Sequence, residues 1–256
     1  MTNNCSKMLG LFIIGFTVIA TVKMTAQTSV KLDTVTKLSQ MKTDSAIWKH
    51  KGTYTLVVID DTDDEDPAPK LDVLNGTCSP IFAGKARSAA KLSFAASPYQ
   101  TYATMSNMQA TLKTDAFMRT PAVGLTSNSP RVTLEKRNVS ITTAFLYGIS
   151  IEGDDDYHLI VGDKNGKNLF NCEISGLPPT TASSYATLKA TRDYITKSLG
   201  SDFCGKTGYT IFKPAIPITI KGSLFYDIDH SPGSVGPAAF RPPTSWEIHP
   251  INALHF

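Results

Sequence analysis

The sequence predicts a mainly β protein, a small five-stranded OB-like barrel with one helix between strands 3 and 4. From Arg131 to the C-terminus, three β-rich runs come first, a helix follows, and two further strands close the chain. This is the chain order of an OB-type barrel, and the helix separates it from a plain meander; other small barrels remain the alternative. Histidines and carboxylates gather at the strand ends. Because such barrels usually bind ligands on an exposed strand face and its loops, these segments form the candidate site.

The first three strands are marked by their composition and by one turn. Val139 to Ile151 is a β-rich run, and Gly148 lies where a barrel strand needs to bend. Tyr157 to Val161 is a second strand whose side chains alternate between its two faces. The turn around Asn165-Gly166 is a strong hairpin pattern, and it predicts that Asn168 to Ile174 returns beside the second strand.

The helix and the last two strands follow from periodicity. Ser183 to Leu199 places its apolar residues on one stripe and stops at Gly200, as expected for an amphipathic helix. Ile216 to Asp227 alternates between apolar and polar residues, which predicts the fourth strand. The proline- and glycine-rich loop Ser231 to Pro243 then leads to the final strand at Trp246. Residues 131–256 are therefore expected to form the OB-like domain.

Residues 1–26 predict a cleaved secretory signal peptide. Lys7 supplies the positive region, an apolar run extends from Leu9 to Val22, and the small residue Ala26 precedes a polar segment. The apolar run is shorter than the roughly 20 residues that a membrane-spanning helix needs. We therefore expect a secreted or periplasmic protein with no transmembrane segment after cleavage. An uncleaved N-terminal anchor is the alternative.

Residues 27–130 predict an N-terminal extension or a small subdomain of irregular α+β structure. Tyr54 to Ile59 is a compact β-type run that meets the acidic linker 60–69. The carboxylates and prolines of this linker do not favour a packed element. Ala83 to Ala96 is rich in alanine and lysine and fits a helix, whereas the fold of the rest of residues 70–130 stays open.

The cysteines predict one disulfide bond. Removal of residues 1–26 leaves Cys78, Cys172 and Cys204, and an oxidising compartment favours one pair. Cys172 ends the third strand and Cys204 follows the helix, so a Cys172–Cys204 bond would pin that helix across the barrel. Cys78 is then the unpaired thiol.

The charge of the barrel domain disfavours tight, nonspecific binding of nucleic acid. Residues 131–256 contain 12 Lys/Arg and 12 Asp/Glu, which gives a net formal charge of zero. Domains that neutralise many phosphates usually show a basic excess. A local basic patch remains compatible with this balance.

A set of histidines and carboxylates forms the candidate ligand or metal site. Imidazole nitrogens and carboxylate oxygens suit a divalent metal ion, or a general acid–base pair that works near neutral pH. No short metal-binding motif is present, so a structural network that ties the barrel together is the alternative. The candidate residues are Asp154, Asp156, His158, Glu173, Asp227, His230, Glu247 and His249.

Four segments resemble a group of exported bacterial proteins of unassigned function. They are Asp156-Tyr157-His158-Leu159, Cys172-Glu173-Ile174, the strand end from Gly222 to His230, and Glu247-Ile248-His249-Pro250. The shared motifs are Asp-x-His-Leu and Glu-x-His-Pro. The resemblance covers about half of the chain, from Arg131 onward, and implies export without implying an activity.

A fainter likeness connects the chain to OB barrels of the staphylococcal-nuclease type. In those barrels an acidic turn before the second strand and acids after the third hold calcium, and arginines bind the phosphate. Gly153-Asp154-Asp155-Asp156 and Glu173 lie in similar places. The arginine expected on the third strand is missing from Leu169-Phe170-Asn171.

The function that we expect is binding of an as yet undefined ligand by an exported OB-like module. A metal-dependent hydrolase, such as a phosphodiesterase or nuclease, is the first alternative, and a structural or interaction protein of the cell envelope is the second. An arginine or lysine pair beside the acidic turn would favour hydrolysis. Exposed aromatic side chains on the second and third strands would favour an oligonucleotide or a sugar.

Overall fold

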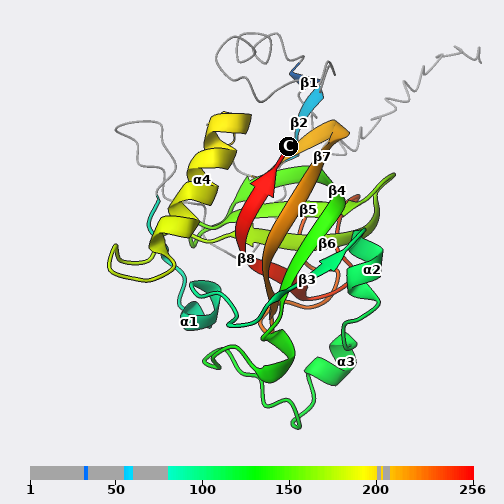
Figure 1. The fold of residues 1–256 in the computed structure, drawn as a ribbon. Helices are drawn as coiled ribbons and strands as arrows, with labels where there is room; N and C mark the ends of the chain where they lie inside the picture. Colours follow the sequence, from blue (N-terminus) through cyan, green and yellow to red (C-terminus); the bar gives the residue numbers. More distant parts are fainter. Residues whose placement is uncertain (1–31, 34–54, 60–79, 201–202, 204–207) are drawn as a thin grey trace, which may run out of the picture.

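The computed structural model describes residues 32–33, 55–59, 80–200, 203 and 208–256 (Figure 1). Strands dominate this part of the chain, and helices are few, so the prediction of a mainly β protein is confirmed. Residues 1–26, the acidic linker 60–69, Cys78 and Cys204 lie outside the described residues. Within the described residues, no helix is both long and apolar enough to cross a membrane.

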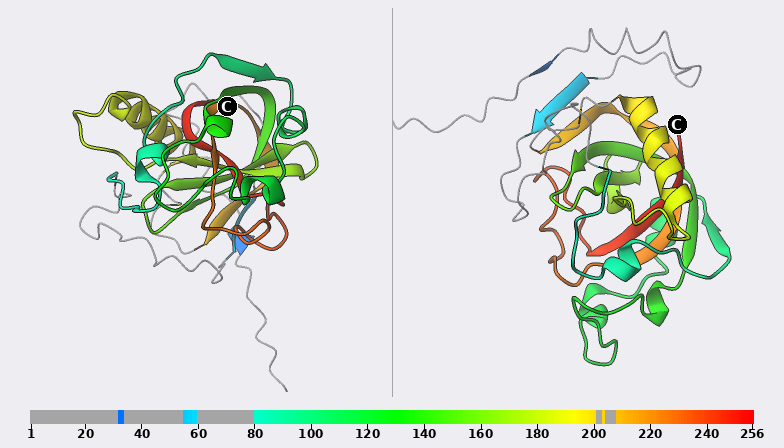
Figure 2. Two further views of the ribbon diagram at one scale, coloured as in Figure 1. Left: turned by 90° about the horizontal axis from the view of Figure 1, so that it is seen from below. Right: turned by 90° about the vertical axis from the view of Figure 1, so that its left-hand side faces the viewer.

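All the described strands belong to one mixed sheet. Its strand order is β1-β2-β7-β8-β6-β5-β4-β3, and a further pairing joins β7 to β4. The strands β4, β5, β6, β8 and β7 thereby close a ring (Figures 1 and 2). The strand bounds are Leu32–Asp33 (β1), Thr55–Ile59 (β2), Tyr99–Tyr102 (β3), Asn138–Ile151 (β4), Tyr157–Asp163 (β5), Lys167–Ile174 (β6), Tyr209–Tyr226 (β7) and Trp246–His255 (β8).

The ring closes because β4 and β7 are long and change register along their length. β4 pairs with both β5 and β7, and both ladders shift between Leu146 and Gly148, at the predicted bend. A Cβ atom on Gly148 would lie 2.8 Å from the side chain of Ile211, so the two strands approach closely there. The β6–β8 and β3–β4 pairs are parallel, whereas the other pairs are antiparallel.

The helices are short, apart from one between β6 and β7. α4 spans Tyr185–Leu199, close to the predicted helix, and lies along β8. The predicted helix from Ala83 to Ala96 is reduced to the single turn α1, Ser88–Lys91. Arg87 precedes this turn with a positive φ of 49°, a conformation that cannot continue a right-handed helix. The other helices are α2 (Met105–Gln109), α3 (Asp115–Met118) and the 3-10 turn η2 (Thr133–Glu135).

The two faces of the ring strands differ in chemistry. On β5, Leu159 and Val161 join the main hydrophobic core, while His158 and Ile160 point to the opposite face, as the alternation predicts. The core also includes apolar side chains from all the other ring strands, from α2 and from α4. The opposite face is buried too, and it carries the charged residues described below.

The predicted disulfide between Cys172 and Cys204 is not supported. Cys172 is a free thiol, fully buried in the main hydrophobic core, and its Sγ atom lies 4.0 Å from the carbonyl oxygen of Phe170. Burial raises the pKa of this thiol well above its ordinary value. The prediction placed Cys172 correctly at the end of β6 but did not account for the inward direction of its side chain.

A buried ion pair connects the segment before β4 to the ring. Nη1 and Nη2 of Arg87 donate to the two carboxylate oxygens of Glu135 at 2.8 and 2.6 Å, and both side chains are essentially inaccessible. The remaining guanidinium hydrogens bind the carbonyls of Ser129, Pro130 and Tyr226. Glu135 also accepts from the backbone N–H of Tyr226, so the pair fastens α1 to the end of β7.

Replacement of Glu135 should destabilise the protein strongly. Glu135→Gln keeps the shape of the side chain but leaves the Arg87 charge buried without its counter-charge. Breaking such a pair costs about 3–5 kcal/mol. Urea unfolding measures this loss. The matched control is Asp193→Asn, which removes the exposed pair Lys189–Asp193 on α4 and should leave the midpoint unchanged. Equal midpoints for the two variants would contradict the role of the buried pair.

Candidate functional site

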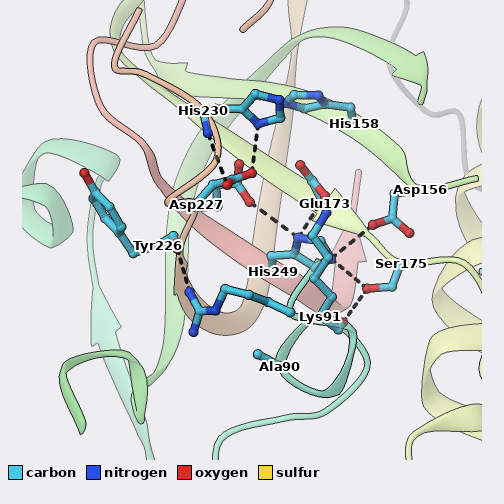
Figure 3. Close-up of polar contacts among 12 residues, drawn as sticks. Ala90, Lys91, Asp156, His158, Glu173, Ser175, Tyr226, Asp227, His230 and His249 are labelled. Carbon is cyan, nitrogen blue, oxygen red and sulfur yellow. Dashed lines mark hydrogen bonds and ion pairs between the residues drawn. The ribbon is translucent and has the colours of Figure 1, made fainter. Parts of the chain in front are cut away.

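The candidate residues gather on the buried face opposite the main core. His158 of β5 lies directly across from Glu173 of β6, and Asn171 of β6 pairs with Glu247 of β8. Side chains in such paired positions share one face, with Cβ atoms about 5 Å apart in an antiparallel pair. Figure 3 shows how the side chains from β5, β6, β8 and the loops converge.

The ring of His249 is the centre of this network. Its Nδ1 lies 2.8 Å from Oε2 of Glu173 and 3.4 Å from Oε2 of Glu247, and its Nε2 lies 3.2 Å from Oδ2 of Asp156. Burial would lower the pKa of His249, but the charge of Glu173 and the hydrogen bonds to the carboxylates raise it well above the ordinary value. At neutral pH the ring of His249 is therefore an imidazolium, with a proton on each nitrogen.

Ser175 lies beside His249 without forming a nucleophilic pair with it. Its Oγ atom is 3.0 Å from Nε2 of His249, while Glu173 contacts the other ring nitrogen, an arrangement that resembles a Ser–His–Glu triad in distances alone. However, the hydroxyl of Ser175 donates to the carbonyl of Lys91 at 2.7 Å. Because a protonated His249 cannot accept the hydroxyl proton, this serine is not activated for attack.

Lys91 places a second positive charge in the network. Its ammonium group lies 3.2 Å from Oδ2 of Asp154. Burial works against its charge, but Glu173, Asp154 and other carboxylates raise the pKa of Lys91 well above its ordinary value. Burial, and then the neighbouring charge of Asp156, raise the pKa of Asp154 to about 6.

Glu173 and Glu247 share the buried face but differ in proton affinity. Burial opposes the ionisation of Glu173, yet the His249 charge keeps the pKa of this carboxyl well below its usual range. Burial, and then the charge of Glu173, raise the pKa of Glu247 to about 7. Neighbouring positive charges therefore stabilise the ionised form of Glu173 more than that of Glu247.

His158 has one ring nitrogen engaged and one without a partner. Its Nδ1 lies 3.2 Å from Oε1 of Glu152 and 3.0 Å from the hydroxyl of Tyr209. Its Nε2 is buried and has no hydrogen-bond partner among the described residues, and the residue as a whole is only 2 % exposed. Burial would lower the pKa of His158, but Glu152 and then Glu173 raise it to about 10.

His230 closes the site from the loop after β7. Its Nδ1 lies 2.8 Å from Oδ2 of Asp227, and its side chain is 47 % exposed. The hydrogen bond to Asp227 outweighs burial and raises the pKa of His230 to about 9. Burial opposes the charge of Asp227, but His230 lowers the pKa of that carboxyl to about 2. Arg119 and Ser245 bind the carbonyl of His230 and hold this loop in place.

The structure brings the predicted residues into one region but not into one contact group. Asp156, Glu173 and Glu247 meet at His249, and Asp227 meets His230. Asp154 contacts Lys91 instead, and His158 contacts Glu152 and Tyr209.

Sequence reasoning missed four of the participants. Glu152 follows the first strand directly and could have been included with the acidic turn. No pattern marked the other three as site residues. These are Lys91, Ser175 and Tyr209.

One group of ligand-type side chains is already close enough to surround an ion. In the described part of the chain, atoms of Asp156, Glu173 and His249 lie within 4.8 Å of one another. The ring of His249 lies between the two carboxylates, with Nδ1 2.8 Å from Glu173 and Nε2 3.2 Å from Asp156, so its proton already supplies the positive charge at this position.

Comparison with known proteins gives no relative for this chain. No family model matches it, and neither a curated protein nor a solved structure does. Any functional conclusion therefore depends on the geometry and charge of the site.

The charge of His158 should make stability depend on pH. Its pKa in the folded protein, about 10, lies above the ordinary value of about 6.5, so protonation stabilises the fold. This contribution is fully present below pH 6.5 and disappears as pH rises through about 10. In urea unfolding, the stability difference between the wild type and His158→Gln should therefore shrink from pH 6.5 to 10.

The control is His255→Gln, which alters an exposed histidine at the end of β8. Its difference from the wild type should stay constant over the same range. A His158→Gln difference that stays level from about pH 7.5 to 10 would show that the buried ring is neutral.

Proposed function

We propose that this protein is an exported OB-type binding module that takes a small cationic ligand on its buried polar face. The strand order supports the OB assignment, since β4, β5, β6, β8 and β7 close the ring and α4 lies between the third and fourth of them. OB folds bind ligands on the face of strands 2 and 3 and in the loops between strands 1 and 2 and strands 4 and 5. Here these are β5, β6, the β4–β5 loop and the β7–β8 loop.

Six of the eight candidate residues come from those places, and the other two, Glu247 and His249, lie on β8. His158 lies on β5 and Glu173 on β6, Asp154 and Asp156 lie in the β4–β5 loop or next to it, and His230 lies in the β7–β8 loop. If these charged groups only stabilised the barrel, they would not need to lie on the strands and loops that usually bind ligands. Their distribution supports a binding role.

The single observation that carries the proposal is the unpartnered Nε2 of His158. A buried polar atom without a hydrogen bond costs about 1–3 kcal/mol, and native proteins retain few of them. Because the protonated ring can only donate from this atom, the missing partner is an acceptor, such as the oxygen of a water molecule carried by a bound cation. The surrounding charge favours a cation, because six acidic side chains share this face with four basic ones. The acidic residues are Glu152, Asp154, Asp156, Glu173, Asp227 and Glu247; the basic ones are Lys91, His158, His230 and His249.

Oligonucleotides and sugars fit this face less well. Tyr157 on β5 and Phe170 on β6 are buried and belong to the main core, so the described part of these strands offers no aromatic platform for stacking. The acidic excess would also repel phosphate groups.

A metal-dependent hydrolase is the second candidate, favoured by the close group of Asp156, Glu173 and His249. Lys91 and Arg192 also flank the acidic turn, as phosphate chemistry would require. However, Arg192 donates to the carbonyls of Asp155, Ile174 and Ser175 and Lys91 is paired with Asp154, so both cations already serve the fold. This reading is therefore weaker than cation binding.

Export is part of the proposal and has its own test. The positive, apolar and small-residue order of residues 1–26 supports cleavage after Ala26. Mass spectrometry of the protein recovered from a bacterial periplasm or medium should give a mature chain that starts at Gln27. A chain that retains residues 1–26 would contradict this assignment.

Cation binding predicts a thermal shift. Unfolding of the full chain would be followed with Mg²⁺, Ca²⁺, Mn²⁺, Zn²⁺ or spermidine, and with phosphate and a short single-stranded DNA as anionic controls. At a hundredfold excess over Kd, a ligand stabilises by about 2.7 kcal/mol, which raises Tm by several degrees. At least one cation, and neither anion, should produce this shift.

Two variants locate the effect. Glu247→Gln should reduce the cation-induced shift relative to its own ligand-free Tm, because it removes acidic charge from the polar face. Asp193→Asn removes an exposed carboxylate on α4 and should leave the shift unchanged. A shift with phosphate or DNA, or none with any cation, would refute cation binding.

A further inference from the structure

We propose that Asp156, Glu173 and His249 bind a divalent transition-metal ion, which takes the place of the proton on one nitrogen of the His249 ring. This inference rests on the proposed function, because it names the cation of the same polar face. One imidazole nitrogen and two carboxylate oxygens are ligands that zinc accepts in proteins.

The three side chains already surround one point. Glu173 lies on β6, His249 on β8, and Asp156 directly precedes β5, and Figure 3 shows the three converging. One ligand atom from each residue lies within 4.8 Å of the other two. Ligands lie about 2 Å from a zinc ion and hence roughly 3–4 Å from one another, so small side-chain rotations would complete the contact.

A buried oxygen without a hydrogen bond points to a missing ligand in this group. Oδ1 of Asp156 accepts from the backbone N–H of Gly176 at 2.6 Å, which fixes the carboxylate. Oδ2 of the same residue forms no hydrogen bond of normal geometry among the described residues, although it lies 3.2 Å from Nε2 of His249. Such an oxygen loses its hydration without a full replacement. A metal ion would supply the missing partner.

Each nitrogen of His249 has an acceptor outside the metal group. Nε2 lies 3.0 Å from Oγ of Ser175, and Nδ1 lies 3.4 Å from Oε2 of Glu247. A histidine that binds a metal through one nitrogen usually donates from the other to such an acceptor, which fixes the orientation of the ring. Whichever nitrogen binds the ion, the other therefore keeps a partner that holds the ring in place.

The proton on His249 defines what the ion replaces. Binding releases this proton to solvent and leaves the lone pair of the nitrogen for the metal. Exchange of a proton for a dication adds one positive charge to a face on which acidic side chains outnumber basic ones. Glu173 also connects the ion to His158, its cross-strand partner, whose Nε2 lacks the acceptor that a metal-bound water would supply.

The burial of the three ligands indicates a structural ion rather than a catalytic one. Asp156 and His249 are fully buried, and Glu173 is 6 % exposed. Catalytic zinc sites keep one position open to substrate, whereas structural sites are closed. The ion would therefore enter while the chain folds, and it should exchange slowly afterwards.

Refolding of the untagged full chain with Zn²⁺ tests the proposal. The chain would be unfolded in urea with a chelator, refolded with Zn²⁺ and desalted, and it should then retain about one Zn²⁺ per chain by elemental analysis. Asp156→Asn removes the charge of the unpartnered oxygen, so competition with a chelator should show a loss of Zn²⁺ affinity of about tenfold or more. Asp154→Asn is the matched control, because this carboxyl of the same turn contacts Lys91 and should not be needed for Zn²⁺.

A measurement on the wild type keeps the test valid if Asp156→Asn fails to fold. X-ray absorption at the zinc edge should show a single imidazole together with oxygen ligands. Two imidazoles, or none, would overturn the proposal. Equal Zn²⁺ affinities of Asp156→Asn and Asp154→Asn would overturn it as well.

The cation panel distinguishes the failure of this inference from that of the proposed function. A thermal shift with Mg²⁺, Ca²⁺ or spermidine but no retention of Zn²⁺ would refute the metal site and retain a cation-binding face. No response to any cation would refute both.

Discussion

The imidazolium of His249 makes the buried polar face of this protein stable. Three carboxylates from two strands and a loop lie within 3.4 Å of its nitrogens, and none of these side chains is accessible enough for water to solvate its charge. Without a proton on both ring nitrogens, these groups would repel one another in a medium of low dielectric constant. The ammonium group of Lys91 adds a second positive charge, which acts on Glu173 and Asp156 as well. The positions of β5, β6 and β8 relative to one another therefore depend on electrostatic compensation as well as on the apolar core on their other face.

The segment ahead of β4 is an integral part of this arrangement. Arg131 donates to the carbonyls of Leu224, Ala90 and His249, and so connects β7, α1 and β8 at one point. With the Arg87–Glu135 pair, it fixes the turn from which Lys91 enters the network. Guanidinium groups suit this role because one planar group can satisfy several carbonyls that the irregular backbone leaves without partners. The polar face is thus assembled from both halves of the chain.

Local patterns predicted the elements of the ring, whereas long-range contacts decided the site. The alternation of Tyr157 to Val161 correctly placed His158 opposite the core, and the Asn165-Gly166 turn correctly joined β5 to β6. The start of β7 at Tyr209 was missed, because Pro214 and Pro217 interrupt its pattern. Lys91 could not be identified, since its partner Asp154 is 63 positions away and nothing local distinguishes it from a surface lysine. The disulfide prediction is not supported for a similar reason, because spacing along the chain did not reveal that Cys172 faces the core.

The position of β8 in the ring has a consequence for how the protein is made. β8 follows β7 along the chain, yet it lies between β6 and β7 and pairs with both. During translation, β4 to β7 therefore emerge from the ribosome before the strand that completes their pairing. Until then the edges of β6 and β7 are open, and Glu173 lacks the imidazolium that compensates its charge. Contacts between distant parts of a chain form slowly, because the loop entropy must be overcome first. The ring therefore cannot close until β8 is synthesised.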